Sequence, residues 1–446
     1  MSNVTLSTNC CIVGGGPAGI MLGYLLARRG VQVTVLEKHK DFNRDFRGDT
    51  VHPSTLQVMH ELGLLQGLLK LPHQTVETVS GVYGDFHFQA VDFRGVPGRC
   101  KYAAMMPQWD FLNYLSREAS RFSTFDLRME HEAIDLVRED GRISGVVVRG
   151  PGQRIFQIAA NLVVGCDGRH SLTRIAGRLD PLEFGVPMDV LWFRISRKPG
   201  DPEEVLGNVN YGKVLILNNR SDYFQAGLVI AKGSFASIRE CGLHEFRRTI
   251  SRIAPYLEDR VEELTDWRQI QILTVQLNRL PQWHCPGLLC IGDSAHAMSP
   301  VGGVGINLAI QDAVAAANLL AEPLQEGRVT QEGLAAVQKR REFPAQVTQA
   351  AQARIHTVLG KIFAQSGPLR APWQLKLAVQ VPGIHRALGY AVGIGVRPEH
   401  VNRPSVPDVA RRSSILRATL GAAIGFAVTL AALRLVLRKS AEPRAA

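Results

Sequence analysis

The sequence has few cysteines that could pair and no pattern that would bind a metal. Its seven cysteines are scattered, odd in number and free of any C-x-x-C pair. This distribution argues against a disulfide framework and a zinc site, and it is typical of buried, reduced thiols in a cytosolic protein. The first ten residues lack a basic region followed by an apolar core, so we expect no secretory signal.

Internal repeats and low-complexity stretches are also missing. The apolar content of 46% is ordinary for a globular protein, which argues against a largely disordered chain. A chain of 446 residues can bury two or more cores, so we expect at least two domains.

A glycine-rich turn is the first clear motif that is present. It follows an apolar run at 10–13 that predicts a buried strand, and it opens an apolar helical pattern that ends near Arg29. Gly14, Gly16 and Gly19 fit the pattern G-x-G-x-x-G. In such a turn the first glycine permits the tight bend, the second lets a pyrophosphate approach the backbone, and the third lets helix and strand pack closely.

A second strand, predicted at 31–36, ends on Glu37. A carboxylate about 20 residues beyond the glycines accepts hydrogen bonds from ribose hydroxyls, and it would repel a 2′-phosphate. A lone glycine motif could be a plain turn. Here strand, glycines, helix, strand and acid follow in the required order, which predicts a site for a dinucleotide whose ADP half carries no 2′-phosphate.

Two later segments repeat the construction of a buried strand that ends in an acid. Residues 160–166 lead into Asp167, and residues 287–291 lead into Asp293. A glycine-rich loop then opens a helix predicted at 306–320. Asp293 alone could merely cap a turn. The repeated construction favours a ligand role at the carboxyl edge of a sheet.

The middle of the chain has a different pattern. Residues 181–276 are rich in strand candidates, interrupted by helical stretches near 245–254 and 256–264. We interpret this region as a second, antiparallel domain inserted between pieces of the nucleotide-binding domain.

Taken together, these motifs resemble the FAD-dependent monooxygenases of the para-hydroxybenzoate hydroxylase fold, in particular the ubiquinone-pathway and polyketide hydroxylases. The resemblance covers about residues 9–396. It depends on three groups of residues: Gly14–Gly19 with Glu37, Cys166–Gly168, and Gly292–His296 with Pro300 and Gly302–Asn307.

The resemblance implies an α/β fold in which a Rossmann-type FAD-binding domain carries an inserted, mainly antiparallel substrate domain and a helical C-terminal part. The predicted FAD-binding parts are 1–75, 106–180 and 281–396, and the last part includes C-terminal helices. The predicted substrate-domain parts are 76–105 and 181–280, and a linker (397–412) and a membrane anchor (413–439) follow.

The resemblance also implies residue roles around FAD. Amides near Ala18 would hold the pyrophosphate, Arg47 would lie near the phosphates, and Gln108 would contact the flavin chain. Asp293 would bind the ribityl or phosphate part, and Asp167 would take part in handling FAD and NADPH. Gly305 and Ile306 would present N–H groups to the isoalloxazine ring. The implied cofactor-binding set is Gly14, Gly16, Ala18, Gly19, Glu37, Lys38, Arg47, Gln108, Asp167, Asp293, Pro300, Gly305 and Ile306.

No catalytic side chain is implied. His52 and His296 invite an interpretation as general bases, but a histidine without a visible partner is more commonly structural.

The chemistry implied by the resemblance belongs to the cofactor. NAD(P)H would reduce the flavin transiently. A flavin C4a-hydroperoxide would then hydroxylate or epoxidise a lipophilic aromatic, quinone-like or polyene substrate. Two alternatives stay open: a flavin-dependent reductase of isoprenoid double bonds, and a catalytically silent, FAD-stabilised membrane-associated binding protein. A flavin halogenase is disfavoured because the W-x-W-x-I-P signature is missing.

The C-terminal tail concentrates positive charge beside an apolar segment. From Arg397 onward, nine basic and three acidic residues supply six of the eleven excess positive charges. Residues 418–433 carry no charge, and a spanning helix of about 20 residues is reached only if Arg417 and Arg434 extend to the interfaces.

We expect a C-terminal membrane anchor with the remaining chain on the cytoplasmic side. If the tail is only a packed helix, we expect a cytoplasmic protein. The main body has no basic helix with interleaved aromatics, so no nucleic-acid partner is expected.

Overall fold

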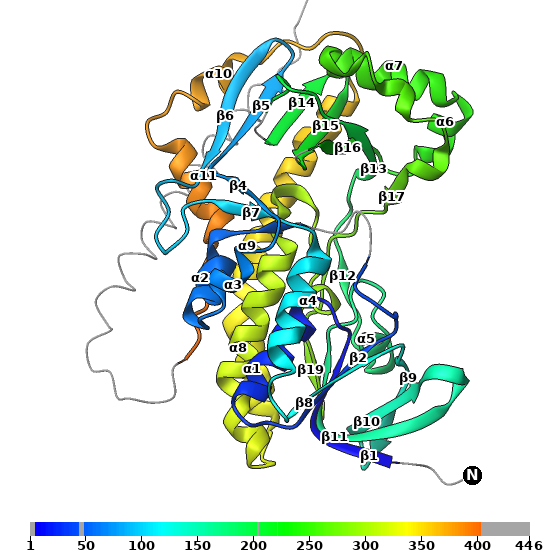
Figure 1. Ribbon diagram of the computed structural model, residues 1–446, viewed down its shortest axis with the longest axis vertical. Helices are drawn as coiled ribbons and strands as arrows, with labels where there is room; N and C mark the ends of the chain where they lie inside the picture. Colours follow the sequence, from blue (N-terminus) through cyan, green and yellow to red (C-terminus); the bar gives the residue numbers. More distant parts are fainter. Residues whose placement is uncertain (1–4, 44–48, 203–204, 221, 403–446) are drawn as a thin grey trace, which may run out of the picture.

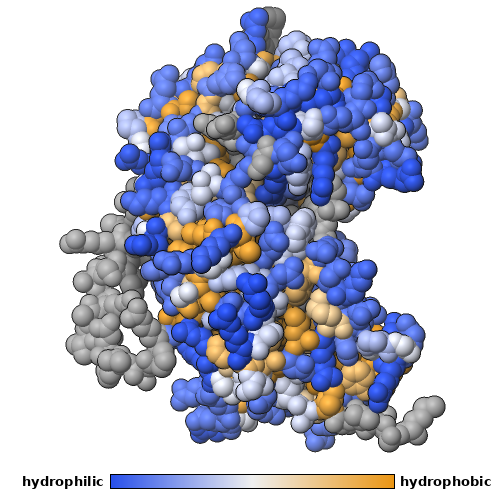
Figure 2. Space-filling view, viewed as in Figure 1, coloured by the Kyte–Doolittle hydropathy of each residue, from blue (hydrophilic) through white to orange (hydrophobic). Residues whose placement is uncertain are grey.

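The computed structural model describes residues 5–43, 49–202, 205–220 and 222–402. Two large sheets occupy opposite ends of the molecule, and helices α1 (Pro17–Arg28), α8 (Gly305–Gln325) and α9 (Gln331–Phe363) lie beside them (Figure 1). On the face shown in Figure 2, the upper part is mainly hydrophilic and apolar residues gather over the middle and lower parts.

The first sheet has eight strands, and its central members are parallel. Its main path is β19-β20-β11-β1-β2-β8, with β10 and β9 joined to β11 as an antiparallel hairpin. The parallel pairs bring the carboxyl ends of β1, β2, β11 and β20 to one edge. The strands are β1 (Thr5–Val13), β2 (Val33–Glu37), β8 (Phe125–Met129), β9 (Glu132–Glu139), β10 (Arg142–Arg149), β11 (Ile155–Gly165), β19 (His284–Cys285) and β20 (Leu288–Cys290).

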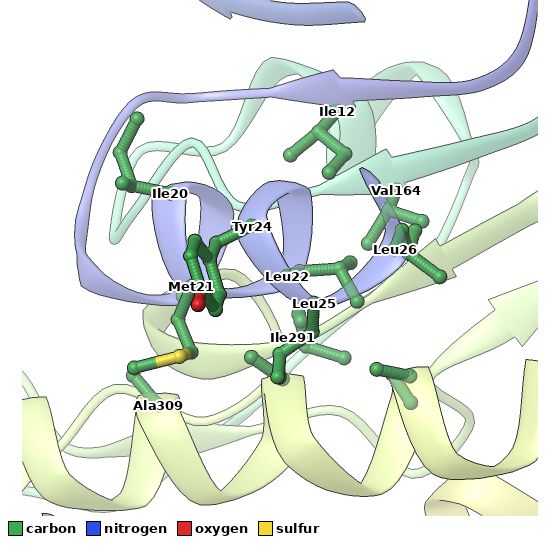
Figure 3. Packing of buried hydrophobic residues seen from close by; sticks show 14 of the residues in the cluster. Ile12, Ile20, Met21, Leu22, Tyr24, Leu25, Leu26, Val164, Ile291 and Ala309 are labelled. Carbon is green, nitrogen blue, oxygen red and sulfur yellow. The ribbon is translucent and has the colours of Figure 1, made fainter. Parts of the chain in front are cut away.

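Helix α1 joins the first sheet to α8. All five residues of β2 are buried, as is typical of a parallel strand covered on both faces. Figure 3 shows Met21 of α1 pointing toward Ala309 of α8, with Leu25 close to Ile291. A Cβ on Gly23 would lie 2.8 Å from the Phe125 ring, so α1 packs closely on this sheet.

The second sheet has seven strands in the order β17-β13-β16-β15-β14-β5-β6. Every pair is antiparallel except β14–β5, so the expected mainly antiparallel sheet is confirmed. The strands are β5 (Thr78–Tyr83), β6 (Phe86–Asp92), β13 (Met188–Ser196), β14 (Val205–Asn210), β15 (Lys213–Asn219), β16 (Tyr223–Ala231) and β17 (Gln271–Leu273).

The two faces of the second sheet have different partners, because side chains alternate along a strand. Leu191, Phe193 and Ile195 of β13 join a core with α7 (Leu243–Ile253), beside α6 (Phe235–Glu240). Val190 and Trp192, which alternate with them, line the cavity inside the molecule.

Smaller elements complete the fold. A three-stranded sheet has the order β3-β7-β4, and β12 pairs with β18. These elements are β3 (Thr50–Val51), β4 (Gln74–Val76), β7 (Ala103–Met105), β12 (Leu182–Glu183), β18 (Asn278–Arg279), α2 (Pro53–Glu61), α3 (Leu65–Leu68), α4 (Gln108–Ala119), α5 (Leu172–Ala176), α10 (Trp373–Ala378) and α11 (Ile384–Gly393).

Helix α9 is the longest element of the described chain, with 33 residues. It contacts β19 of the first sheet and β13 and β16 of the second. Pro344 lies inside it and is buried. One helix therefore packs against both ends of the molecule.

The helix expected at 256–264 is wrong. The structure has two short 3₁₀ turns there, Pro255–Leu257 and Val261–Glu263. Arg260 interrupts them with φ −143°, and its guanidinium donates to Asp201 (2.6 Å) and to the carbonyl of Tyr256. The ion pair fixes a bend that the apolar spacing of the sequence does not reveal.

The start of the predicted linker is packed against the body. Glu399 accepts hydrogen bonds from Arg340 at 2.8 and 2.9 Å, and His400 lies 2.6 Å from Glu61 at the end of α2. The rest of the 397–412 linker and the predicted anchor at 413–439 lie outside the described residues. Within the described residues, one helix, Val301–Gln325, is long and apolar enough to cross a membrane, and 72% of its apolar window is buried inside the protein. That helix contains α8, a core element in the middle of the chain.

Candidate active site

The turn between β1 and α1 has the geometry expected for a pyrophosphate site. Gly14 has φ 108°, and a Cβ there would lie 2.4 Å from the carbonyl oxygen of Cys166. A Cβ on Gly19 would lie 1.9 Å from the Gly14 oxygen, so helix and turn could not pack as they do. At Gly16, in contrast, no described atom lies within 4 Å of the Cβ position.

The first turn of α1 has no side-chain cap, so its amides are available to a ligand. An open backbone and uncapped amides at a helix start fit a diphosphate group.

Glu37 lies at the end of β2, where a ribose would be held. Its side chain is buried, and its two oxygens accept hydrogen bonds from the amides of Gly15 (3.1 Å) and His39 (3.0 Å). These donors fix the orientation of the carboxylate at the cavity wall, with Lys38 beside it. The arrangement fits recognition of a hydroxyl pair.

The Asp167 carboxylate is used largely within its own loop. It accepts hydrogen bonds from Ser171 Oγ (2.6 Å), Thr173 Oγ1 (2.9 Å) and the Thr173 amide (2.9 Å), which brace the start of α5. Asp167 also lines the cavity. Its visible bonds are structural, and its predicted part in handling FAD and NADPH stays a prediction.

Asp293 pairs with a residue that the sequence analysis missed. Arg169 Nε donates to Asp293 Oδ2 at 3.1 Å, and both side chains line the cavity. Arg169 directly follows Asp167 and Gly168. Its position next to this motif was the one feature of the sequence that could have indicated a role in the site. The ion pair joins the ends of β11 and β20.

Asn307, in the first turn of α8, forms hydrogen bonds with β3 and the start of α2. The side-chain oxygen of Asn307 accepts hydrogen bonds from the His52 amide (2.9 Å) and Thr55 Oγ1 (2.6 Å), and its nitrogen donates to the Thr50 carbonyl (3.2 Å). No side chain caps the start of α8. The amides of Gly305 and Ile306, which both line the cavity, can therefore meet a ligand.

One cavity of about 1780 Å³ brings most of the predicted residues together. A single ligand site is usually roughly 300–1,000 Å³, so this volume has room for a dinucleotide and an organic molecule. Gly19 packs behind the wall, and Arg47 lies outside the described residues. The predicted residues on the wall are Gly14, Gly16, Ala18, Glu37, Lys38, Gln108, Asp167, Asp293, Pro300, Gly305 and Ile306.

The far half of the cavity is bounded by the second sheet and is apolar. Among the described lining residues of β5, β6, β13 to β17, α9 and α11, none is charged. Asn218, Gln225 and Gln271 are the larger polar side chains there. All the described charged side chains of the lining lie outside these elements.

The two histidines considered as bases have different surroundings. His52 lines the cavity, is 1% exposed, and its ring lies against backbone groups of Val392, Gly302 and Gly303. Burial lowers the pKa of His52 to about 4, so the ring is neutral. His296 lies 2.6 Å from Asp312 in a fully buried pair and is not part of the wall.

Asp312 supports the Gly292–Asp293 turn from behind. It accepts a hydrogen bond from the Gly292 amide (3.0 Å) and pairs with His296 and Arg341. Burial alone would raise the pKa of Asp312, but these two partners lower it below its usual value. His296 is therefore held as part of a structural network.

A buried ion pair between Asp49 and Arg220 was also missed. Arg220 follows β15 of the second sheet, and Asp49 precedes β3 on the cavity wall. Burial lowers the pKa of Arg220 to about 10. The pair joins two segments that are far apart in the sequence, so no local pattern predicts it.

Fold and site together define an α/β protein in which the edge of a parallel sheet fits a dinucleotide. A second, mainly antiparallel sheet lies across the same cavity. The FAD binding domain family matches residues 7–351, and the chain belongs to this family. It is similar to 6-methylpretetramide 4-monooxygenase of Streptomyces rimosus, with 30% identity over 82% of this chain and 88% of the relative.

Two further similarities bear on the function. Dialkyldecalin synthase of Streptomyces rugosporus shares 26% identity over 91% of this chain and 83% of its own length. The solved structure of OxyS anhydrotetracycline hydroxylase from Streptomyces rimosus matches with a TM-score of 0.69 at 21% identity, over 87% of this chain and 76% of that chain, and it supports the fold alone. The predicted resemblance to FAD-dependent monooxygenases is confirmed, and the protein is an FAD-dependent oxidoreductase.

Proposed function

We propose that this protein hydroxylates a lipophilic, uncharged aromatic substrate, with NAD(P)H as the reductant. The observation that carries the proposal is the division of the cavity. The charged groups of its described lining lie outside the part formed by the second sheet, α9 and α11, and the described residues of that part offer apolar side chains and a few neutral polar ones. An ionised substrate would lose its hydration there without gaining a counter-charge.

The cofactor half supplies the groups that FAD requires. The α1 amides and Gly16 would hold the diphosphate, Glu37 the ribose, and Asp293 the ribityl or phosphate part. When bound, FAD reduced by NAD(P)H would activate O₂, so that one oxygen atom enters the substrate and the other leaves as water. Residues around the ring would orient it and exclude water.

Gly305 and Ile306 would stabilise negative charge on the flavin ring. Their amides lie at the start of a helix of 21 residues, where the partial positive charge of the helix concentrates. Donors that are fixed in place before the reaction stabilise developing charge without reorganisation. The apolar walls of the far half keep water away from the reacting atoms.

The function is tested with purified, FAD-loaded full-length protein, NADPH or NADH, O₂ and a panel of lipophilic phenols. We expect substrate-dependent oxygen uptake and a product heavier by one oxygen atom, measured by mass spectrometry. Saturation of an isoprenoid double bond without oxygen would instead establish the reductase alternative.

A second candidate is a protein that keeps FAD without redox turnover. The similarity to a protein named as a synthase favours this candidate, because one scaffold can serve several chemistries. Bound FAD with no NAD(P)H oxidation across the whole panel would support it and overturn the monooxygenase.

The C-terminal segment 413–439 is proposed as a membrane anchor that keeps the body on the cytoplasmic side, near a substrate that dissolves in lipid. Its uncharged stretch and basic flanks support this proposal. Deleting the residues after Arg411 should move the protein from the membrane fraction to the soluble fraction. If the shortened protein is distributed between the membrane and soluble fractions as before, the segment is not an anchor.

The domain boundaries given above stay predictions.

A further inference from the structure

A row of directly paired residues crosses the second sheet on its cavity side. From β5 to β17 the row consists of Gly81, Gly207, Ile216, Gly227, Trp192 and Gln271. Paired residues on neighbouring strands face the same side of a sheet. Gly207, Ile216, Trp192 and Gln271 all line the cavity. Three of the six positions are glycine, which strands ordinarily disfavour.

Two of these glycines make room for aromatic rings of the protein. A Cβ on Gly81 would lie 2.7 Å from the ring of Phe88, and a Cβ on Gly227 would lie 2.9 Å from the ring of Trp192. Three ring atoms of Trp192 lie within 3.1 Å of that position, so the indole lies flat against the backbone. A side chain explains each of these two glycines.

Gly207 is different. No described atom lies within 4 Å of its Cβ position, and its φ is not in the left-handed region. Neither the backbone conformation nor a packing neighbour requires glycine here. Glycine inside a strand marks a place where another group approaches the backbone closely, and the open space beside Gly207 belongs to the cavity.

The surroundings of Gly207 form a flat and uncharged floor. Ile216 lies next to it in the row, and the indole of Trp192 lies on the same face. Ile355 and Leu359 of α9 line the same cavity, and α9 packs against β13 and β16. A molecule on this floor meets bare backbone, an aliphatic side chain and an aromatic ring.

We propose that Gly207 sets the size limit of the substrate, by leaving a flat slot on the second sheet for an uncharged molecule of at least three fused rings. The inference deepens the proposed function, because it names the substrate class of the same site. A side chain at 207 would fill the space over the backbone and exclude the ring that lies there. A single-ring molecule would still find room over Ile216 and Trp192.

The test compares Gly207→Val and Gly207→Ala with the unaltered protein. Valine suits a strand, so the substitution should not harm folding. Gly360→Ala is the matched control, because Gly360 of α9 also has open space at its Cβ position but is not among the residues that line the cavity. The full-length, FAD-loaded proteins are titrated without NAD(P)H, and binding is read from the change in flavin absorbance. The probes are 1,8-dihydroxyanthraquinone and other three-ring phenols, with resorcinol as the single-ring probe.

We expect Gly207→Val to weaken three-ring binding by at least about tenfold, the scale on which one or two methyl groups act in an apolar pocket. Gly207→Ala should have a smaller effect in the same direction. Resorcinol binding, FAD content and the Gly360→Ala variant should stay within about twofold.

Equal losses for both ring sizes, or no loss for either, would overturn the proposal, as would a failure of the unaltered protein to bind any three-ring probe. Binding is measured separately from oxygen uptake. If three-ring probes bind in a way that depends on Gly207 but are not hydroxylated, the proposed slot is supported and the proposed monooxygenase function is wrong.

Discussion

The two sheets use glycine for opposite purposes. At the edge of the first sheet, glycine is required at positions 14 and 19, because a Cβ there would lie 2.4 Å and 1.9 Å from backbone oxygen atoms. In the second sheet, no described atom outside the adjoining residues lies within 4 Å of the Cβ position of Gly207. The first sheet therefore offers a ligand main-chain groups whose geometry is fixed by sequence spacing. The second sheet offers alternate positions from several strands, where we expect small changes to alter selectivity before they alter the fold.

The largest expected effect comes from crowding the first sheet. Gly19→Ala places a methyl group on the Gly14 oxygen, so α1 must move away from the turn. We expect a loss of about 4 kcal/mol in the free energy of unfolding, measured by urea denaturation, together with loss of FAD. Gly16→Ala is the control. It should fold normally but bind FAD less tightly, because it intrudes only on the ligand. If Gly19→Ala is as stable as the unaltered protein, packing does not require glycine at this position, and the contrast with Gly207 is wrong.

The next effect concerns the buried ion pair that links the two halves. Arg220→Gln leaves the Asp49 carboxylate buried without its partner, so we expect a loss of about 3 kcal/mol in unfolding free energy. Adding Asp49→Asn should recover part of this loss, because no charge then stays buried. If the double variant is as unstable as the sum of both single variants, the pair does not couple the halves.

His52 predicts a dependence of stability on pH. Its pKa is about 4 in the folded protein, and an unfolded histidine has about 6.5, so the unfolded chain binds more protons between these values. Stability should therefore fall as the pH falls, by about 2 kcal/mol between pH 7 and pH 5 from this residue. Denaturation curves of His52→Asn should show a shallower pH dependence by that amount. Identical curves for both proteins would contradict a buried neutral ring.

The smallest effect is expected at the ribose site. Glu37→Gln keeps the shape of the side chain but removes its charge, so we expect the Kd for FAD to rise about tenfold, or about 1.4 kcal/mol. Flavin fluorescence during titration of apoprotein measures this change. Glu139→Gln, on the exposed end of β9, is the control and should leave the affinity unaltered. If Glu37→Gln binds FAD as tightly as the unaltered protein, the prediction that Glu37 binds the ribose is wrong.

The sequence predicted the strand–helix–strand unit better than the contacts between distant segments, for a physical reason. Gly14, Gly19 and Glu37 lie within one strand–helix–strand unit, where spacing alone determines geometry. The pairs Arg169–Asp293 and Asp49–Arg220 join segments far apart in the chain, so only the fold reveals them.

The error at residues 256–264 has a related cause. The apolar spacing there suits a helix, but Arg260 binds Asp201 and bends the chain. The open space at Gly207 was likewise invisible, because a glycine in a sequence does not show whether a ring, a backbone or a ligand approaches it.

Helix α9 makes the two ends of the molecule mechanically dependent on each other. A rotation of the second sheet toward or away from the flavin would have to flex or carry this 33-residue rod, since it touches strands of both sheets. Pro344 lacks the amide hydrogen that would complete the helical ladder, so bending costs least at that point. Bending of α9 at Pro344 would thus change the angle between the two sheets.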